Sequence, residues 1–248
     1  RIAWSRLSAL LIISGAFGLF RRSAVEEVGG WWTETVGEDA ELVARLHRHF
    51  SSKGIDYRVE FVPDPVCWTE APESLRVLGR QRRRWQRGLA ETISRHRRTL
   101  GNSRYGPFGL LAMPFYFVFE MLGPLVALAG YLVLPVAAAT GMLSIELMAA
   151  FMVVALLLGI LLSVAALALE ELSFRRHVRH REAARLLLYA VLDNLGYRQL
   201  NDLYRVLGLI DFFRKKHSWG EMERRGIGRV EEGGEVPVPS RPTAMPVR

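Results

Sequence analysis

Cysteine is almost absent from this chain of 248 residues, which contains Cys67 alone. A single thiol excludes a disulfide within the chain and is typical of a cytosolic portion. Histidine is also sparse, and its six copies lack metal-ligand spacing, because His47, His49, His177 and His180 lie among charged residues. The composition therefore predicts neither a disulfide scaffold nor a metal site formed by this chain.

Charge is almost absent from two long stretches, residues 108–139 and 143–169. Each exceeds the roughly 20 residues that a helix needs to cross a bilayer, and a buried helix of a soluble protein is rarely so long. The link at residues 141–144 holds no Lys or Arg, whereas both outer flanks are rich in Arg. The positive-inside rule then predicts a transmembrane hairpin whose outer flanks are both cytoplasmic.

Positive charge dominates the rest of the chain, with a formal net charge of +8. The arginines cluster at residues 80–87, 95–98 and 175–181, beside the apolar stretches. That placement favours attraction to anionic membrane lipid over binding of nucleic acid. The chain begins at Arg1 without Met or a signal peptide, so we expect a piece of a longer protein.

Two short segments have the pattern of strands. Residues 10–13 are apolar, and Gly15 and Gly18 after them allow a neighbouring backbone or a ligand to approach closely. Residues 57–62 alternate in polarity before two prolines. We therefore expect each segment to form a β-strand.

Glu38 and Asp39 precede a predicted helix over residues 40–50, whose apolar residues recur at helical spacing: Leu42, Val43, Leu46 and Phe50. Two interpretations of the carboxylates remain open. They cap the helix, where its dipole favours negative charge, or one of them acts as a general base beside a ligand cleft.

Residues 70–74 are predicted to start a second helix, with Pro and acidic residues in its first turn, and this helix carries the sequence Gln81-Arg82-Arg83-Arg84-Trp85. Its apolar residues gather near one face and its arginines line another, as in a helix on a membrane surface. Trp85 then lies at headgroup level. Alternatively, the Arg forks and the Trp ring bind a ligand that carries both phosphate and sugar.

Residues 186–213 are apolar in phase but contain many polar residues, with basic clusters on both sides. This pattern favours interfacial or re-entrant helices broken near Gly196, and a third crossing remains the alternative. Residues 228–248 are rich in Gly, Glu and Pro, which predicts a disordered tail.

Three of these segments together resemble membrane-bound family 2 glycosyltransferases, which include the synthases of cellulose, hyaluronan, chitin and poly-N-acetylglucosamine. Residues 13–22, Ile-Ser-Gly-Ala-Phe-Gly-Leu-Phe-Arg-Arg, resemble the acceptor-side segment of the family. Residues 37–42 resemble its T-E-D segment, with Gly37 in place of the usual Thr, and residues 81–85 match its Q-x-x-R-W signature. The resemblance covers about residues 10–220.

The resemblance implies a role for each matched residue. Asp39 is the expected base that deprotonates the acceptor hydroxyl, and Trp85 is expected to stack under the acceptor's terminal sugar. Gln81 and Arg84 are expected around the donor diphosphate, where Arg stabilises the leaving group. The remaining expected substrate-binding residues are Glu38, Gly15, Ala16 and Phe17.

The resemblance also implies an architecture. The expected class is α/β, a partial GT-A-type domain over residues 1–104, followed by two transmembrane helices over 105–172. Basic cytoplasmic, interfacial or re-entrant helices are expected over residues 173–227, and a disordered tail over residues 228–248. The expected cofactors are a nucleotide-sugar donor, a UDP-sugar, and Mg²⁺ or Mn²⁺ held by an amino-terminal half outside this chain.

The resulting expectation is inverting sugar transfer to a glycan or lipid-linked acceptor at the cytoplasmic face of a plasma membrane, with this fragment inactive by itself. One alternative is a non-catalytic docking or secretion-complex partner, in which Asp39 and Trp85 tolerate replacement. Another is a basic membrane anchor, in which charge matters and the identities of Gln81 and Trp85 do not.

Overall fold

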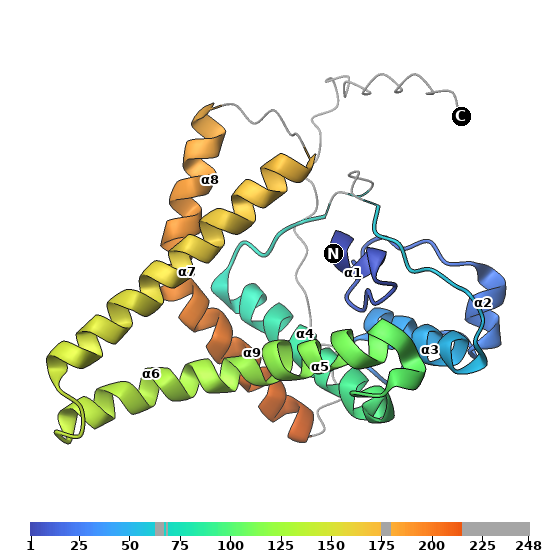
Figure 1. The fold of residues 1–248 in the computed structure, drawn as a ribbon, viewed down its shortest axis with the longest axis horizontal. Helices are drawn as coiled ribbons and strands as arrows, with labels where there is room; N and C mark the ends of the chain where they lie inside the picture. Colours follow the sequence, from blue (N-terminus) through green and yellow to red (C-terminus); the bar gives the residue numbers. More distant parts are fainter. Residues whose placement is uncertain (63–66, 68, 175–179, 215–248) are drawn as a thin grey trace.

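The computed structural model describes residues 1–62, 67, 69–174 and 180–214, which are helical or irregular (Figure 1). Short 3₁₀ and π-helical turns connect α4 to α6 and α8 to α9. The α-helices in chain order are α1 (Ile2–Arg6), α2 (Arg22–Glu27), α3 (Glu38–Lys53), α4 (Leu75–Arg95), α5 (Met113–Phe115), α6 (Gly123–Ala139), α7 (Ile145–Phe174), α8 (His180–Leu192) and α9 (Arg198–Phe213).

The predicted α/β class is wrong for the described part of the chain, where no strand is present. A strand needs a neighbour to complete its ladder, and here other groups take the hydrogen bonds. The carbonyl of Leu10 lies 2.9 Å from Nε2 of His47 in α3. Ser5 donates to the carbonyl of Val59 and accepts from the N–H of Phe61. Both segments are therefore irregular and form no sheet with another described segment.

Helix α3 has the expected carboxylates in its first turn, and it begins at Glu38 and ends at Lys53. Gly54 closes it in the left-handed region with φ of 65°, which favours glycine. The apolar side chains buried on its inner face are Ala40, Leu42, Val43, Ala44 and Leu46. The helical period in the sequence thus predicted this element and most of its buried face, but Phe50, predicted on that face, is only half-buried.

The core lies where α3, α4 and the start of the first long apolar stretch meet. Phe108 is fully buried and stacks on the His47 ring, with centroids 4.3 Å apart. The first apolar stretch is therefore anchored in the packed part of the molecule before it becomes exposed. The core residues are Ala9, Leu11, Ala44, Leu89, Ile93, Phe108, Ala112, Met113 and Tyr116.

Helix α4 starts after Ser74, whose hydroxyl accepts a hydrogen bond from the N–H of Val77. Two of the arginines expected on its exposed face form contacts within the protein. Arg83 pairs with Asp211 of α9 at 2.7 Å, and the buried Arg87 pairs with Glu91 at 3.3 Å. Helix α9 therefore covers part of the face that the sequence assigned to a membrane surface.

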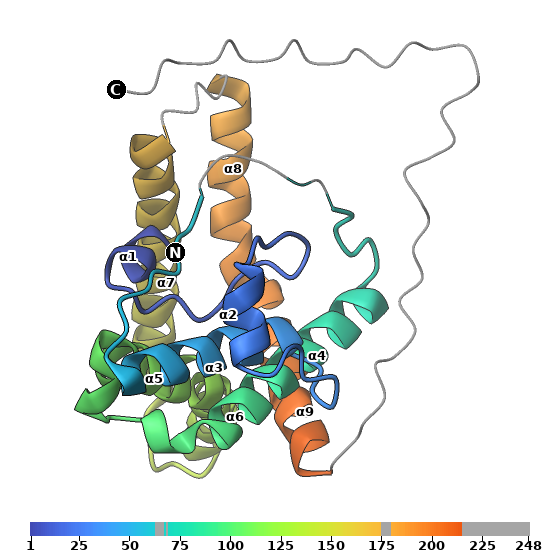
Figure 2. The same cartoon turned by 90° about the vertical axis from the view of Figure 1, so that its right-hand side faces the viewer.

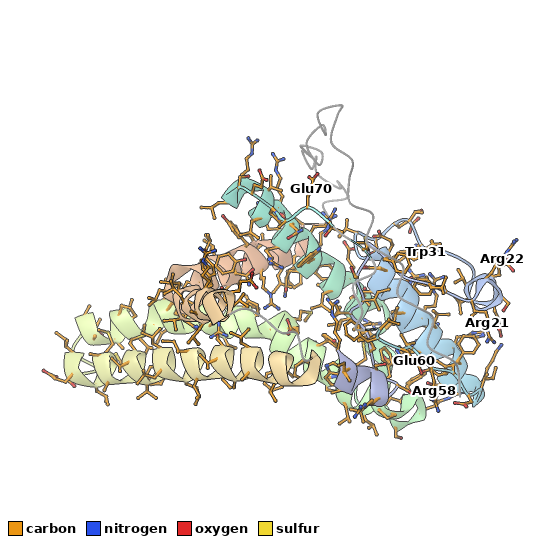
Figure 3. The ribbon with its side chains drawn as sticks, turned by 90° about the horizontal axis from the view of Figure 1, so that it is seen from above. Arg21, Arg22, Trp31, Arg58, Glu60 and Glu70 are labelled. Carbon is orange, nitrogen blue, oxygen red and sulfur yellow. The ribbon has the colours of Figure 1, made fainter. Side chains whose placement is uncertain are left out.

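Two stretches of the described chain, Phe108–Ala139 and Ile145–Leu169, are long and apolar enough to cross a membrane. Only 6% of the most apolar window of each is buried. The stretches diverge from the short turn between α6 and α7 (Figure 1). Most sticks along these helices are carbon and point outward, whereas Arg21, Arg22 and Trp31 lie at the opposite end (Figure 3).

The predicted break near Gly196 is present between α8 and α9, where Gly196 has φ of 97° and Leu195 leaves the helical region. Helix α8 then runs beside α7 (Figure 2). Asn194 next to the break is buried and donates to the hydroxyl of Ser163 in α7. The predicted tail, residues 228–248, lies outside the described residues.

Candidate functional site

A cavity of about 680 Å³ lies between residues 13–20, the loop at 31–33 and the start of α3. This volume falls within the roughly 300–1,000 Å³ typical of small-molecule sites. We call it the aspartate cavity. Its lining residues are Ile13, Ser14, Gly15, Ala16, Phe17, Gly18, Phe20, Trp31, Trp32, Thr33, Glu38 and Asp39.

Asp39 is held by the first turn of α3. Its Oδ1 accepts a hydrogen bond from the N–H of Ala40 at 2.8 Å. Its Oδ2 lies against Gly15, so closely that a Cβ added to Gly15 would come within 2.9 Å of it. A side chain at residue 15 would therefore displace the carboxylate, and the glycine is required by this close approach.

The loop before Asp39 is fixed by Glu91 of α4. Oε2 of Glu91 accepts from the Thr35 hydroxyl at 2.6 Å and from the N–H of Val36 at 3.1 Å. Arg87, one turn earlier in α4, holds the other oxygen of the same carboxylate. Hydrogen bonds of this kind to a charged group are among the stronger ones in proteins. Helix α4 thus fixes the position of the loop that leads into α3 and Asp39.

Gly37 and Gly88 allow the two helices to approach this closely. A Cβ added to Gly37 would lie 2.9 Å from the Cα of Gly88, and a Cβ on Gly88 would lie 2.9 Å from the Cα of Gly37. These neighbours are backbone atoms, which cannot move without shifting a helix. Gly37, which stands where the family usually has Thr, therefore allows the backbone contact with α4, because a side chain there would meet Gly88.

The structure brings together five of the eight predicted site residues around the aspartate cavity, and the other three lie on α4 outside its lining. Trp85 is 52% exposed, and the Arg82 guanidinium lies 4.5 Å from the centroid of its ring. Gln81 and Arg84 are half-buried. Trp85 precedes Gly88, the residue of α4 that contacts Gly37, by three residues, about 4.5 Å along the helix axis.

Sequence reasoning missed an aromatic wall of the aspartate cavity. Trp31 packs edge-on against Phe20, with centroids 5.5 Å apart. Trp32 lies under the Arg95 guanidinium at 3.6 Å and donates to Glu34. The adjacent tryptophans after two glycines were the available signal, but they follow no helical or strand period.

Below the cavity, the fully buried Glu41 joins α3 to the end of α4. It contacts Arg45 at 2.7 Å, Arg95 at 3.2 Å and His96 at 3.2 Å. Burial by itself would raise the pKa of Glu41, but hydrogen bonds from His96 and Arg45 outweigh it and leave the pKa below its usual value. Glu41 is therefore an ionised link between the two helices.

Helix α9 supports α4 from the other side. Arg205 donates to the side-chain oxygen of Gln86 in α4 at 2.9 Å and to the Glu120 carboxylate at 2.8 Å. The Gln86 amide in turn donates to the carbonyls of Glu120 and Met121. Glu120, an expensive charge in an apolar stretch, thus has a cationic partner.

The family model for glycosyl transferase family group 2 matches residues 1–168, which is more than half of the sequence. The chain therefore belongs to this family of glycosyltransferases, as the sequence motifs predicted. Helices α8 and α9 lie beyond the matched residues.

The chain is similar to two curated poly-beta-1,6-N-acetyl-D-glucosamine synthases. That of Staphylococcus epidermidis is 36% identical over 91 residues, which is 37% of this chain and 21% of the relative. That of Staphylococcus aureus strain COL is 39% identical over 87 residues, 35% of this chain and 20% of the relative. The match thus spans about a fifth of each relative's length. No solved structure matches this chain.

The divalent ion expected from the resemblance finds no suitable donor set in the described residues. None of their His, Cys, Asp and Glu residues form a group of three or more that could hold a metal. The aspartate cavity has two carboxylates, Glu38 and Asp39, and one oxygen of Asp39 is bound to the backbone. These two carboxylates therefore do not form a metal site by themselves.

Proposed function

We propose that this chain forms the acceptor side of a membrane-bound glycosyltransferase, which transfers a sugar with inversion from a nucleotide-sugar to a glycan or lipid-linked acceptor. The observation that carries the proposal is the position of Asp39. Its carboxylate lines a cavity of ligand size and lies against the glycine segment at residue 15. Membership of the glycosyltransferase family supports the reaction class.

The walls of the aspartate cavity suit a sugar. Phe17 and Trp31 are about half-exposed, so their rings offer apolar faces to the C–H face of a pyranose. The carboxylates of Glu38 and Asp39 accept hydrogen bonds from hydroxyl groups. A mostly apolar cavity with a few polar groups that fix orientation is the usual design of a small-molecule site.

In the proposed reaction, Asp39 takes the proton of the acceptor hydroxyl as general base. The acceptor oxygen then forms a bond to the anomeric carbon of the donor sugar, while the bond from that carbon to the diphosphate breaks. The electron pair of the broken bond leaves with the nucleoside diphosphate. One displacement inverts the anomeric centre, and no covalent enzyme intermediate is needed.

Gln81, Arg84 and Trp85 are proposed to serve the same reaction from α4. The contact between Gly37 and Gly88 carries this part of α4 to the start of α3. Arg84 would stabilise charge on the departing diphosphate, with Gln81 beside it. Trp85 would stack against the acceptor sugar, because half of its surface is accessible.

The first donor to test is UDP-N-acetylglucosamine, because both relatives are named as synthases of an N-acetylglucosamine polymer. We further propose that α6 and α7 cross the plasma membrane and that α3 and α4 lie on its cytoplasmic side. The length and exposure of the two apolar stretches support the crossing, and the flanking arginines support the orientation.

The proposal is tested by nucleotide release from a panel of nucleotide-sugars, in membranes containing the protein expressed from its complete reading frame. Asp39→Asn keeps the shape of the side chain but removes the base, so turnover should fall about 10²–10⁴-fold. Asp56→Asn is the matched control, because Asp56 is an exposed carboxylate outside the cavity lining. Its turnover should not change.

Trp85→Ala should raise the KM for acceptor more than it lowers kcat. Unchanged turnover in both Asp39→Asn and Trp85→Ala, with normal amounts of protein in the membrane, would contradict the roles proposed for Asp39 and Trp85. Full biological function without any nucleotide release would instead favour the non-catalytic docking protein.

A further inference from the structure

A second cavity, of about 410 Å³, lies on the other half of α3 from Asp39. It is formed by the end of α2, the C-terminal half of α3 and the turn Ser103–Tyr105, and we call it the arginine cavity. Helices α2 and α3 lie beside each other in both views (Figures 1 and 2). The lining residues are Glu27, Val28, Arg45, Arg48, His49, Ser52, Arg104 and Tyr105.

Positive charge is in excess in the arginine cavity. Three guanidinium groups line it, together with one carboxylate, that of Glu27. This carboxylate is already engaged, because Oε1 of Glu27 lies 2.8 Å from Nε2 of His49 and 2.9 Å from Nζ of Lys53. The cavity lining therefore has no further negative group to balance Arg48 and Arg104, whereas Arg45 is paired with Glu41 outside the lining.

Two of the arginines have donors to offer to a ligand. Arg48 is exposed and forms no hydrogen bond or ion pair with any other described residue. Arg104 reaches the carbonyl of Ser52 at 3.4 Å, a long contact that an anion would replace readily. Arg45 differs from them, because it is held by the carbonyl of Val28 and by Glu41. Arg48 and Arg104 thus have donors available to a ligand, whereas both terminal nitrogens of Arg45 already donate to the protein.

We propose that the arginine cavity binds a phosphate group carried by a larger molecule. Arg presents its N–H groups as a fork that matches phosphate oxygens, and clusters of Arg are a recurring solution for phosphate recognition. The volume of about 410 Å³ leaves space for more than the phosphate itself. The ring of Tyr105 supplies an apolar wall for the rest of the molecule.

The phosphate has two chemical sources, a lipid headgroup or a soluble phosphate ester. Arg104 precedes Leu110, the first exposed apolar residue of the first apolar stretch, by six positions. A lipid headgroup at the membrane surface would therefore come within reach of the cavity. A soluble ester would enter from the open side of α3, and the same donors would hold it.

One short segment of the chain joins the lining of the arginine cavity to that of the aspartate cavity. Arg45 donates to the carbonyl of Val28, and the next two residues, Gly29 and Gly30, have positive φ before the loop that carries Trp31. Asp39 of the aspartate cavity and Arg48 of the arginine cavity are nine positions apart in α3, which corresponds to about 14 Å along the helix axis. An effect of phosphate on sugar transfer rests on the proposed function, whereas phosphate binding does not.

Binding is measured directly, with the protein from its complete reading frame purified in a neutral detergent. The probes are dioctanoyl phosphatidic acid for the lipid source and glycerol 3-phosphate for the soluble source, each titrated calorimetrically. Dioctanoyl phosphatidylcholine, whose phosphate is masked by choline, is the reference lipid. Wild-type protein should bind at least one of the two phosphate monoesters more tightly than the reference.

The test variant is Arg48→Gln with Arg104→Gln, and the matched control is Arg21→Gln with Arg58→Gln. Arg21 and Arg58 are exposed and lie outside both cavities (Figure 3). Replacing them removes the same two positive charges as the test variant. The test variant should bind about tenfold more weakly for each charge-assisted hydrogen bond lost. The control should stay within about twofold of wild type, and both variants should keep the wild-type melting temperature.

Weakened binding of phosphatidic acid alone supports the lipid headgroup, and weakened binding of both esters supports a soluble ligand. The proposal is overturned if wild-type protein binds neither ester. Equal losses in the test and control variants also overturn it, because they show attraction to net charge without a site. Since binding is read without turnover, an inactive protein that still binds phosphate would reject the proposed function alone.

Discussion

The α3–α4 region and the α6–α7 pair are both helical, but they differ in which side chains they bury and which they expose. In the first, charged and polar groups are buried with partners, among them Glu41, His47 and Arg87. In the second, large apolar side chains remain exposed, and 6% of each apolar window is buried. The first region is therefore held together by protein contacts, whereas the second leaves apolar side chains uncovered, which supports the proposed membrane crossing.

The comparison shows where single substitutions should matter. In the α3–α4 region several buried or half-buried charged groups have specific partners, among them Glu41 and Glu91, so removing one partner leaves the other unsatisfied. Along α6 and α7 a substituted side chain has few protein neighbours to disturb. The same chemical change should therefore have a large effect in one region and a small effect in the other.

The largest effect is expected from Glu41→Gln. Removing this buried charge leaves the guanidinium of Arg45 and the side chain of His96 without their anionic partner. Breaking a buried pair on one side costs about 3–5 kcal/mol, so the thermal unfolding midpoint in detergent should fall sharply. Glu146→Gln, an exposed carboxylate at the start of α7, is the control and should leave the midpoint unchanged. A tolerated Glu41→Gln would contradict the pairing.

The next effect concerns pH and His47. Burial lowers the pKa of His47 to about 4 in the folded protein, from 6.5 when exposed. Between these values the unfolded chain binds a proton that the folded protein does not. Stability is therefore fully present above about pH 6.5 and decreases as the pH falls to about 4. The difference between the two pKa values corresponds to a full loss of about 3 kcal/mol in the free energy of unfolding.

Unfolding midpoints measured from pH 7.5 to 4 test this decrease. His47→Gln removes the titrating group and should flatten the curve between pH 6.5 and 4.5, at the cost of a lower midpoint at neutral pH. The pKa of Glu41 is lowered in the folded protein. The stability that its ionised carboxylate provides is therefore lost only below the usual pKa of a Glu side chain, in a more acidic window than that of His47. An equally steep decrease in His47→Gln would assign the pH dependence to other groups.

An intermediate effect is expected from the glycine contacts. Gly88→Val should push α4 away from the backbone of Gly37 and lower stability by about 1–3 kcal/mol. Gly130→Val in α6 is the matched control, because a Cβ there meets no atom within 4 Å. The unfolding midpoint should fall in the first variant and stay unchanged in the second. Equal tolerance at both positions would remove the distinction between the two regions.

The smallest effect is expected at the contact between α4 and α9. Arg83 and Asp211 pair at 2.7 Å, with 36% and 11% of their side chains exposed. A double-mutant cycle of Arg83→Gln and Asp211→Asn should give a coupling of about 1 kcal/mol or less. Strictly additive single effects would show that the pair does not hold α9 on α4.

Local signals predicted several elements correctly. The apolar period after Asp39 predicted α3, and Gly196 predicted the break before α9. The start of α4 was predicted too early, because the helix begins at Leu75 and not within residues 70–74. Each depends on residues within one or two turns of the chain, which the sequence shows directly. The resemblance then grouped Gly15 with Asp39, and the structure places them in contact.

Long-range contacts explain what the sequence did not predict. Residues 10–13 and 57–62 have the composition of strands, but a strand forms only where another segment completes its ladder. The backbone of Leu10 pairs with a side chain of α3 instead. Trp31 and Trp32 joined the cavity without any periodic signal, because loop residues are placed by what they pack against.

By itself the sequence determined the helical period of α3 and α4, the two apolar stretches and the motifs that place the chain in its family, since all three are properties of neighbouring residues. Only the tertiary structure decided that Glu91 fixes the loop before Asp39, that α9 covers α4, and that arginines of α3 and the Ser103–Tyr105 turn share a cavity. Each of these joins residues more than 50 positions apart, for example Thr35 with Glu91 and Arg83 with Asp211. Their meeting depends on how the whole chain packs.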